Sequence, residues 1–271
     1  MAMFHKNNQE QDSALSFRNQ RRNILSENSS FIVKEAYKSL RTNISFSQSS
    51  EGCRKVCITS GMPGEGKSIT TLNVAISFAE SGQRVLLIDA DLRRPTIARL
   101  LLENGSVGLS NILAGMCKVE DAIHANCYPN LDVICSGSVP PNPSELLSSP
   151  RMDKLIETMS AKYDYIFIDT PPVNVVTDAC VIAARMDGTL IVARRNHSDR
   201  ESVSRCVNQM KIAGGKILGF VLNGANLERR TKYSKNRYKA YRYDRYYYEM
   251  RPKTEAQQQE KVAQQKKEAE K

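Results

Sequence analysis

Several patterns that would place this chain in other classes of protein are missing from its sequence. It contains no tryptophan, no Cys-x-x-Cys pair, and no Cys or His pair at zinc-ligand spacing, although it holds seven cysteines. No apolar run approaches the roughly 18 residues of a membrane span, and the polar N-terminus lacks the apolar core of a signal peptide. We therefore expect neither a zinc centre nor a membrane span, and we predict a soluble, intracellular protein with reduced cysteines.

The body of the chain carries little net charge. The whole sequence has a net charge of +10, but residues 229–271 hold fourteen Lys and Arg against six Asp and Glu, which is a net +8. Only +2 is left for the first 228 residues. The basic character therefore belongs to the C-terminal segment, and the body is not expected to be a basic nucleic-acid-binding domain.

The apolar residues follow an alternating pattern of strands and helices. Strand-like runs are expected at 55–60, 84–90, 131–136, 163–169, 188–193 and 216–223, and helices at 67–81, about 96–103, 151–161, 175–186 and 200–213. Nearly continuous apolar strands between helices indicate a doubly wound, mostly parallel sheet covered on both faces. With 271 residues, the chain suits one such α/β domain with appendages.

Three segments are expected along the chain. Residues 1–30 are polar and predict a flexible leader, 31–228 form the α/β domain with a first helix at 31–48, and 229–271 form a flexible, basic, Tyr-rich tail. Pro95 and Pro150 suit the first turns of helices, and residues 198–201 (Ser-Asp-Arg-Glu) fit a capping box at the start of another.

A Gly-rich loop directly follows the first strand and precedes a helix. It matches GxxxxGK[ST], the P-loop pattern, in the context that the motif requires. Its backbone N–H groups and the helix N-terminus are suited to phosphate, Lys67 to the β- and γ-phosphates, and the Ser68 hydroxyl to Mg²⁺. The predicted nucleotide-binding residues are Gly61, Met62, Pro63, Gly64, Glu65, Gly66, Lys67 and Ser68.

Carboxylates follow two of the most apolar strands. Asp89 and Asp91 lie at the end of VLLIDAD, and Asp169 ends YIFID, at the edge where a doubly wound sheet binds its ligand. Asp169 occupies the position of a Walker B carboxylate. A simple nucleoside triphosphatase needs only one carboxylate near magnesium, whereas a second can accept a proton from an incoming hydroxyl. Each aspartate could alternatively cap a helix, but three beside a P-loop favour metal and phosphoryl-transfer chemistry.

Asn223 is placed near the end of the last predicted strand. We predict that it reads a purine edge. Because Asn-Gly is also a common turn pair, an ordinary turn at the end of the strand is the alternative.

Together these motifs resemble the bacterial tyrosine kinase family, in its soluble type that regulates capsule and exopolysaccharide synthesis. The resemblance covers about residues 31–250 and rests on GMPGEGKS (61–68), LLIDADLRRP (86–95), PPNPSELL (140–147), YIFIDTPP (165–172) and the C-terminal tyrosines. It implies a P-loop NTPase fold and ATP-dependent protein-tyrosine phosphorylation with Mg²⁺.

The alternative is an ATPase similar to MinD and ParA with a basic tail that binds DNA or a membrane. Those families carry a lysine just after the first glycine of the P-loop, where this chain has Met62. Their iron–sulfur relatives need a Cys-x-x-Cys pair. Both differences favour the kinase interpretation.

The family resemblance implies a role for each matched residue. Lys67, Asp89, Asp91 and Asp169 are the expected catalytic residues, with Ser68, Asp89 and Asp169 as the magnesium ligands. Asp89 is the base or a metal-linked carboxylate, and Arg93 contacts phosphate or a neighbouring subunit. The family's oligomerisation motif, Glu-x-x-Arg-x-x-Arg, is matched by Glu35, Lys38 and Arg41, with lysine in place of the bidentate middle arginine.

The resemblance also implies partners. These are a homo-oligomeric ring, a transmembrane adaptor of the polysaccharide export machinery whose cytoplasmic end activates the kinase, and a protein-tyrosine phosphatase. The expected location is cytoplasmic, at the inner face of the membrane through the adaptor. A nucleic-acid partner is not expected.

The Tyr-rich tail is best interpreted as a substrate of the kinase. Seven of the eleven tyrosines lie in residues 229–250, where no Leu, Ile or Val occurs, so a packed core is not their purpose. We predict phosphorylation in trans at Tyr233, Tyr238, Tyr241, Tyr243, Tyr246, Tyr247 and Tyr248. Basic residues interleaved with aromatics also suit single-stranded nucleic acid or anionic lipid, and plain solvated disorder is a further alternative.

Overall fold

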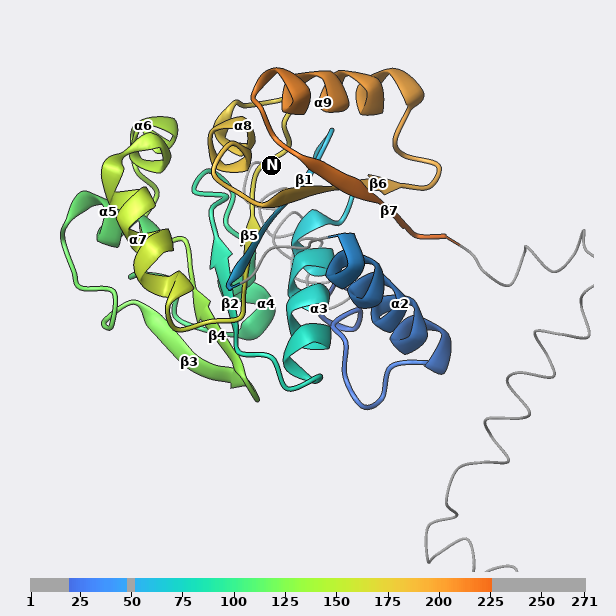
Figure 1. The fold of residues 1–271 in the computed structure, drawn as a ribbon, viewed down its shortest axis with the longest axis horizontal. Helices are drawn as coiled ribbons and strands as arrows, with labels where there is room; N and C mark the ends of the chain where they lie inside the picture. Colours follow the sequence, from blue (N-terminus) through green and yellow to red (C-terminus); the bar gives the residue numbers. More distant parts are fainter. Residues whose placement is uncertain (1–19, 48–51, 226–271) are drawn as a thin grey trace, which may run out of the picture. The chain divides into compact units, whose positions relative to one another are not determined.

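The strands that the structure describes form one sheet at the centre of the fold (Figure 1). A computed structural model describes residues 20–47 and 52–225 of the chain. In these residues seven strands lie in the order β3-β4-β2-β5-β1-β6-β7. All neighbouring pairs are parallel except β3 and β4, which are antiparallel. The strands are β1 (Arg54–Ser60), β2 (Val85–Asp89), β3 (Ile123–Tyr128), β4 (Leu131–Ile134), β5 (Tyr165–Asp169), β6 (Gly188–Arg194) and β7 (Ile217–Asn223).

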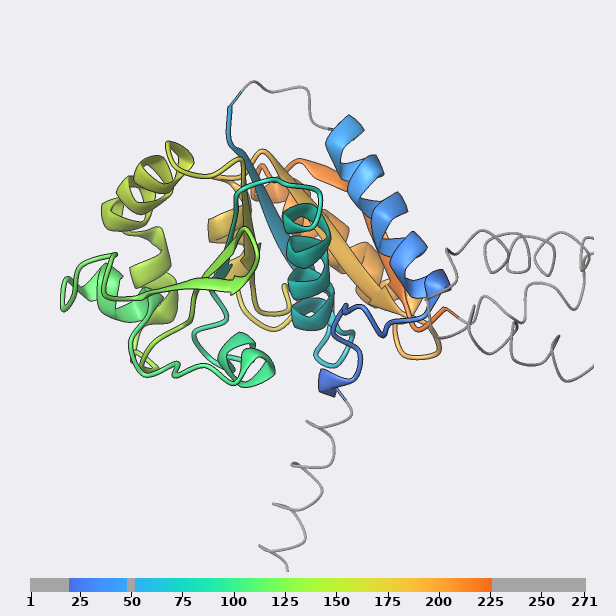
Figure 2. The same cartoon turned by 90° about the horizontal axis from the view of Figure 1, so that it is seen from below.

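Helices cover both faces of this sheet (Figures 1 and 2). One face packs against α2 (Phe31–Ser47), α3 (Lys67–Ala79) and α4 (Ile97–Leu101). The other packs against α5 (Leu109–Ala114), α6 (Pro143–Ser148), α7 (Pro150–Ser160), α8 (Asp178–Ala183) and α9 (Arg200–Ile212). The predicted doubly wound fold of the P-loop NTPase type is confirmed, and it follows from strands that must be apolar on both sides.

Burial is greatest in the strands that carry the motifs. Every residue of β2 and β5 is buried, because these strands lie inside the sheet with helices above and below. Phe78 of α3 packs against Tyr165 and Phe167 of β5, with ring centroids 4.2 and 5.1 Å away. Burial of an aromatic side chain of this size stabilises the fold by about 2 kcal/mol. The aspartates at the ends of β2 and β5 are thus held on rigid elements.

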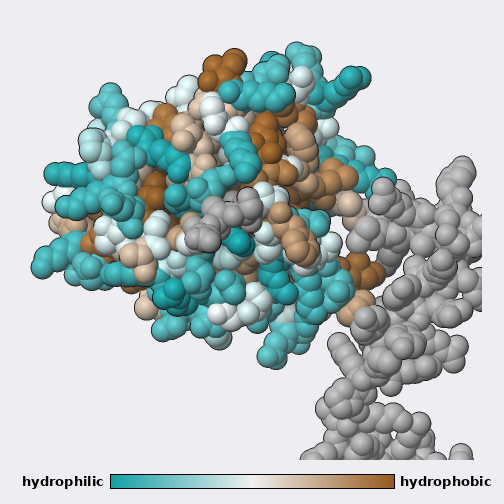
Figure 3. Space-filling view, in the orientation of Figure 1, coloured by the Kyte–Doolittle hydropathy of each residue, from teal (hydrophilic) through white to brown (hydrophobic). Residues whose placement is uncertain are grey.

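The outer strand β7 differs from these central strands. Phe220 and Leu222 are exposed on it, and Figure 3 shows hydrophobic surface over this strand. Its partial burial follows from its place at the edge of the sheet, where a neighbour is present on one side only.

Residues 23–25, which fall in the segment that was predicted as a flexible leader, pack against the domain. Ile24 and Leu25 are buried. Asn73 of α3 accepts a hydrogen bond from the Leu25 N–H at 2.7 Å and donates to the Asn23 carbonyl oxygen at 2.8 Å. Its amide also lies 3.0 Å from the Tyr37 hydroxyl on α2, so one side chain joins three parts of the fold.

Some local predictions were wrong or incomplete. The strand β3 and the short helices α5 and α6 have no counterpart in the sequence prediction. The first turn of α4 begins after Thr96, so Pro95 precedes the helix, whereas Pro150 does occupy the first turn of α7. The cap of α9 is Asp199, which accepts from the Ser202 N–H at 2.7 Å, and the Ser198 hydroxyl is used elsewhere. None of the helices in the described ranges has the length and apolar character to cross a membrane.

Candidate active site at the carboxyl edge of the sheet

The P-loop joins β1 to α3 and depends on two glycines with left-handed backbone conformations. Gly64 and Gly66 have φ angles of +82° and +89°. At Gly66 a Cβ atom would lie only 2.0 Å from the Asn223 side-chain nitrogen, so the position has no space for a side chain. Helix α3 then begins at Lys67 without a side-chain cap, which leaves its first N–H groups available to an anion.

Lys67 lies in a cluster of carboxylates. Its Nζ atom is 2.8 Å from Asp91 Oδ2, 3.4 Å from Asp169 Oδ2 and 3.2 Å from the Ser68 hydroxyl. Asp89 and Asp169 are register neighbours on β2 and β5. The structure therefore brings together Lys67, Ser68 and all three predicted aspartates, from three separate places in the sequence.

Burial shifts the protonation of this cluster. Burial alone would favour the neutral amine of Lys67, but the carboxylates of Asp169 and Asp91 outweigh it and raise the lysine pKa. Burial raises the pKa of Asp89 to about 7, and the nearby Asp169 charge adds to the effect. The pKa of Asp169 is also raised by burial, although Lys67 opposes the shift. One lysine thus only partly compensates several buried acids.

The carboxylate of Asp89 also organises the loop after β2. Its Oδ1 atom accepts from the Asp91 N–H at 3.1 Å, and Oδ2 accepts from the N–H groups of Thr96 and Ile97 at 3.2 and 3.1 Å. Asp91 Oδ1 in turn accepts from the Arg94 N–H at 3.0 Å. The two aspartates therefore shape the segment that carries them, whatever else they bind.

Arg93 extends from this loop to two helices. Its Nε and Nη2 atoms donate to Asp178 at 2.8 and 3.1 Å, and Nη2 also lies 3.2 Å from the Ser144 hydroxyl. Ser144, at the start of α6, donates to Asp178 at 2.5 Å. Neither Ser144 nor Asp178 was predicted from the sequence to have a role. The only available signal was the position of Ser144 inside the PPNPSELL stretch.

Comparisons with known proteins agree with this geometry. Residues 53–215 match a family model described as an AAA domain. The tyrosine-protein kinase YwqD of Bacillus subtilis is 39% identical over 199 residues, which cover 73% of this chain and 84% of the relative. The chain belongs to the bacterial tyrosine kinase family.

Solved structures of this family of bacterial tyrosine kinases have the same fold. The kinase domain of the Escherichia coli tyrosine kinase ETK superposes with a TM-score of 0.69 at 38% identity, over 71% of this chain and 76% of that one. The chimerical protein CapA2B2 has a TM-score of 0.69 at 34% identity, over 73% and 86% of the two chains. The septum site-determining protein MinD of Pyrococcus horikoshii, bound to Mg-ADP, is more distant, with a TM-score of 0.55 at 27% identity over 65% and 72%.

The donor atoms of this bacterial tyrosine kinase suit magnesium together with a nucleotide. The oxygen atoms of Ser68 and Asp169 lie near Lys67, and Asp89 is the register neighbour of Asp169 on β2. Oxygen is the ligand that Mg²⁺ prefers. In the described residues, no group of three or more His, Cys, Asp or Glu side chains could hold a metal by itself. Magnesium would therefore need phosphate oxygens as further ligands, which is its usual mode of binding beside a P-loop.

Two predicted nucleotide-binding residues have partners within the protein. The Asn223 amide donates to the Glu65 carbonyl oxygen at 3.0 Å and accepts from the Gly224 N–H at 2.8 Å. Glu65 is 1% exposed, and its side chain accepts from the Met62 N–H at 2.8 Å and contacts the Ser198 hydroxyl. Both side chains thus support the loop from within the protein. A purine-reading role for Asn223 stays a prediction.

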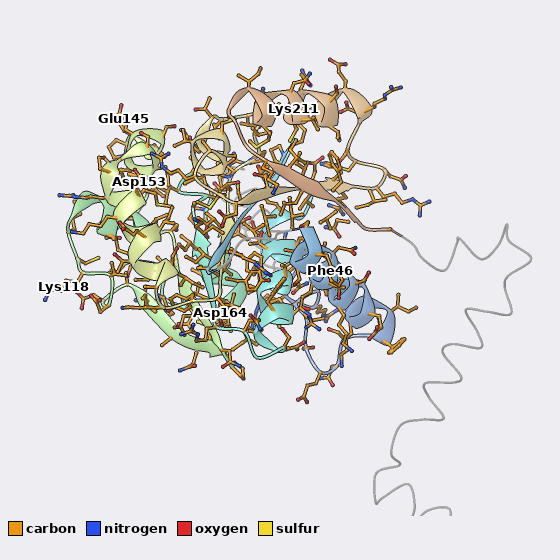
Figure 4. The ribbon with its side chains drawn as sticks, in the orientation of Figure 1. Phe46, Lys118, Glu145, Asp153, Asp164 and Lys211 are labelled. Carbon is orange, nitrogen blue, oxygen red and sulfur yellow. The ribbon has the colours of Figure 1, made fainter. Side chains whose placement is uncertain are left out.

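The predicted oligomerisation residues lie on α2. Lys38 pairs with Glu35 on the same helix at 2.8 Å, and both side chains are about half exposed. Arg41 instead donates to the Ser77 carbonyl oxygen of α3. The helix also exposes apolar residues, among them Phe46, which is 85% exposed and is labelled in Figure 4. The seven predicted tail tyrosines lie outside the described residues.

Proposed function

We propose that this protein is an ATP-dependent protein-tyrosine kinase that phosphorylates its own C-terminal tyrosines. The observation that carries the proposal is the contact of Lys67 with both Asp91 and Asp169, beside Asp89, at the carboxyl edge of the sheet. In such a cluster, the lysine can bind the transferred phosphoryl group and a carboxylate can accept the proton of the acceptor hydroxyl. Membership in the bacterial tyrosine kinase family supports the same reaction.

The contacts support the following roles. Lys67 would bind the β- and γ-phosphates, and Ser68 and Asp169, with Asp89 beside them, would hold the magnesium ion. Asp91 would orient Lys67. Bound Mg²⁺ neutralises charge that develops on the phosphates. The new bond joins the tyrosine oxygen to the γ-phosphorus while the bond from that phosphorus to the β–γ bridging oxygen breaks and ADP leaves. As the base, Asp89 takes the hydroxyl proton; as a metal-linked carboxylate, it leaves that proton to the solvent. A carboxyl whose pKa lies near 7 is suited to proton exchange at neutral pH.

The substrate is the tail of a neighbouring subunit in a homo-oligomeric ring, assembled through Glu35, Lys38 and Arg41 of α2. A ring holds each tail at high effective concentration beside the next site. Each phosphate adds about −1.5 to −2 charges, so seven would add roughly −10 to −14 and reverse the sign of the tail. Repulsion among phosphorylated tails would then loosen the ring and its adaptor contact.

We also propose two protein partners besides the ring. They are a transmembrane adaptor whose cytoplasmic end activates the kinase and a phosphatase that restores the tail, with the kinase in the cytoplasm at the inner face of the membrane. The process regulated is capsule or exopolysaccharide synthesis and export.

The test is mass-spectrometric mapping of phosphotyrosine in residues 229–250 after incubation with Mg-ATP, with and without membranes of the source organism. Lys67→Ala is the inactive variant. Lys55→Ala is the matched control, because Lys55 pairs with Asp187 at the opposite end of β1. We expect phosphate on several tail tyrosines in the wild type and in Lys55→Ala only. Nucleotide hydrolysis with an unmodified tail in both conditions would contradict the proposal and favour an ATPase similar to MinD.

A further inference from the structure

The outer side of the P-loop is held by three side chains from distant parts of the chain. Arg194 Nη1 donates to the Gly64 carbonyl oxygen at 2.9 Å, and His197 Nε2 lies 3.0 Å from the Pro63 carbonyl oxygen. The Asn223 amide donates to the Glu65 carbonyl oxygen at 3.0 Å. We call these three side chains the outer clamp. They secure three consecutive carbonyl groups, one each.

The direction of these carbonyls fixes the direction of the adjoining N–H groups. A peptide unit is planar and trans, so its C=O and N–H point to opposite sides. With the carbonyls of 63, 64 and 65 turned toward the clamp, the N–H groups of 64, 65 and 66 are turned away from it. Backbone N–H groups that converge in this way form an anion-binding concavity.

Few other groups donate hydrogen bonds to the carbonyl oxygens of residues 63–65. In the residues that the structure describes, no backbone N–H donates to these three carbonyl oxygens. Gly64 and Gly66 do not fix the backbone conformation by themselves, since glycine has the greatest backbone freedom of all residues. Without the clamp, these peptide units would lose their described hydrogen-bond partners on the outer side.

The segment that supplies Arg194 and His197 is itself well ordered. The Ser198 hydroxyl accepts from the Arg194 N–H at 2.7 Å, and the Ser198 N–H donates to the Arg194 carbonyl oxygen at 2.9 Å. Asn196 adopts a left-handed conformation with φ of +57°, a conformation that asparagine tolerates. The same Ser198 hydroxyl contacts the Glu65 carboxylate of the P-loop. These hydrogen bonds fix the backbone of the turn that carries the Arg194 and His197 side chains.

We propose that Arg194 and His197, together with Asn223, are positioning residues that hold the P-loop in its phosphate-binding conformation. They act through the loop backbone from the side opposite the N–H groups. The inference rests on the nucleotide binding within the proposed function and does not require tyrosine to be the acceptor. It gives a role to the Arg194–Ser198 turn, which no sequence motif marks.

The experiment compares Mg-ADP binding by calorimetry in the full-length protein. The variant is Arg194→Ala combined with His197→Ala, and the control is Arg195→Ala. Arg195 is adjacent, exposed and of equal charge, and its side chain makes no hydrogen bond or ion pair among the described residues. We expect the Kd of the double variant to rise about tenfold, which corresponds to about 1.4 kcal/mol, and that of the control to change less than about twofold.

Two further measurements separate positioning from general stability. The melting temperature without nucleotide should be the same in the double variant and in Arg195→Ala. His197→Gln, which replaces the ring N–H donor with an amide N–H donor, should bind Mg-ADP more tightly than His197→Ala. Equal Kd values for the double variant and the control would overturn the proposal, as would a loss of affinity that follows an equal loss of stability. Tail phosphorylation, measured separately, tests the kinase reaction and not the clamp.

Discussion

Arg93 and Asp178 form a two-point ion pair across 85 residues of sequence. Arg93 Nε is 2.8 Å from one carboxylate oxygen of Asp178, and Nη2 is 3.1 Å from the other. The Asp178 side chain is fully buried, whereas that of Arg93 is 40% exposed. Because Arg93 lies two residues after Asp91, the pair ties the loop after β2 to α8.

Arg93→Ala should destabilise the protein by about 2 kcal/mol. The change leaves the buried carboxylate of Asp178 with Ser144 as its remaining described side-chain donor, and the partial exposure of Arg93 keeps the cost below that of a fully buried pair. Urea unfolding measures the difference. Arg94→Ala is the matched control, since the neighbouring side chain is exposed and should matter by less than about 0.5 kcal/mol. Equal losses for both variants would show that the ion pair contributes nothing.

The stability of the nucleotide-free protein should fall as the pH rises from about 4 to about 7. Burial and Asp169 raise the pKa of Asp89 to about 7 in the folded state, above its ordinary value of 3.8. In this range the folded protein binds more protons than the unfolded chain, so raising the pH favours unfolding. We expect this carboxyl to contribute a decrease of about 3 kcal/mol.

Asp89→Asn isolates that contribution. The amide keeps one acceptor oxygen for the loop N–H groups but does not titrate, so the decrease between pH 4.5 and 7 should become shallower. Unfolding free energies at several pH values, with EDTA present, measure both slopes. The same pH dependence in the wild type and in Asp89→Asn would assign the proton to a different group.

Lys67→Ala should be less stable than the wild type even without nucleotide. The Lys67 side chain is 12% exposed, and its partners Asp91 and Asp169 are 5% and 0% exposed. Removal of the cation that pairs with both acids leaves two buried carboxyl groups without their lysine partner, at a cost of about 3 kcal/mol. Lys55→Ala, which breaks a more exposed pair with Asp187, should cost less than about 1 kcal/mol.

A second substitution checks the origin of that cost. Asp91→Asn in the Lys67→Ala background removes one of the two uncompensated charges and should recover part of the lost stability. Unfolding in urea again provides the measurement. If the double variant is less stable than Lys67→Ala alone, packing of the lysine chain and not its charge explains the effect.

The predictability of this site from sequence depended on how local each signal is. The P-loop and the aspartates that end β2 and β5 were predictable, because fully buried strands are apolar at every position and their polar ends stand out. The strand β3 was not, since IHANCY is half exposed at the sheet edge and its register shifts along β4. The short helices α5 and α6 have too few residues for a helical period to show.

Contacts between side chains that are far apart in sequence could not be predicted either. Nothing near Asp178 indicates that Arg93 will meet it, and nothing in the 194–198 turn matches a known motif. Asn223 illustrates the limit most clearly: its position at the end of β7 was predicted, but its hydrogen bond to Glu65 depends on the packing of β7 beside the P-loop. Chain topology, not local pattern, creates these contacts.

The last prediction concerns the attachment of α2. Asn73→Ala should destabilise the protein by about 2 kcal/mol, because it leaves the N–H of buried Leu25 without its acceptor and removes the bonds to Asn23 and Tyr37. Asn43→Ala, at an exposed position on α2 itself, should change stability by less than about 0.5 kcal/mol. Urea unfolding measures both.

The same variant also tests whether α2 acts in assembly. Because α2 carries Glu35, Lys38 and Arg41, looser attachment of this helix should weaken self-association, which sedimentation velocity can measure in Asn73→Ala and Asn43→Ala side by side. Hydrogen exchange should accelerate over 23–37 in Asn73→Ala only, since the lost bonds lie there. Faster exchange with unchanged self-association would mean that the ring, if it forms, is assembled through surfaces other than α2.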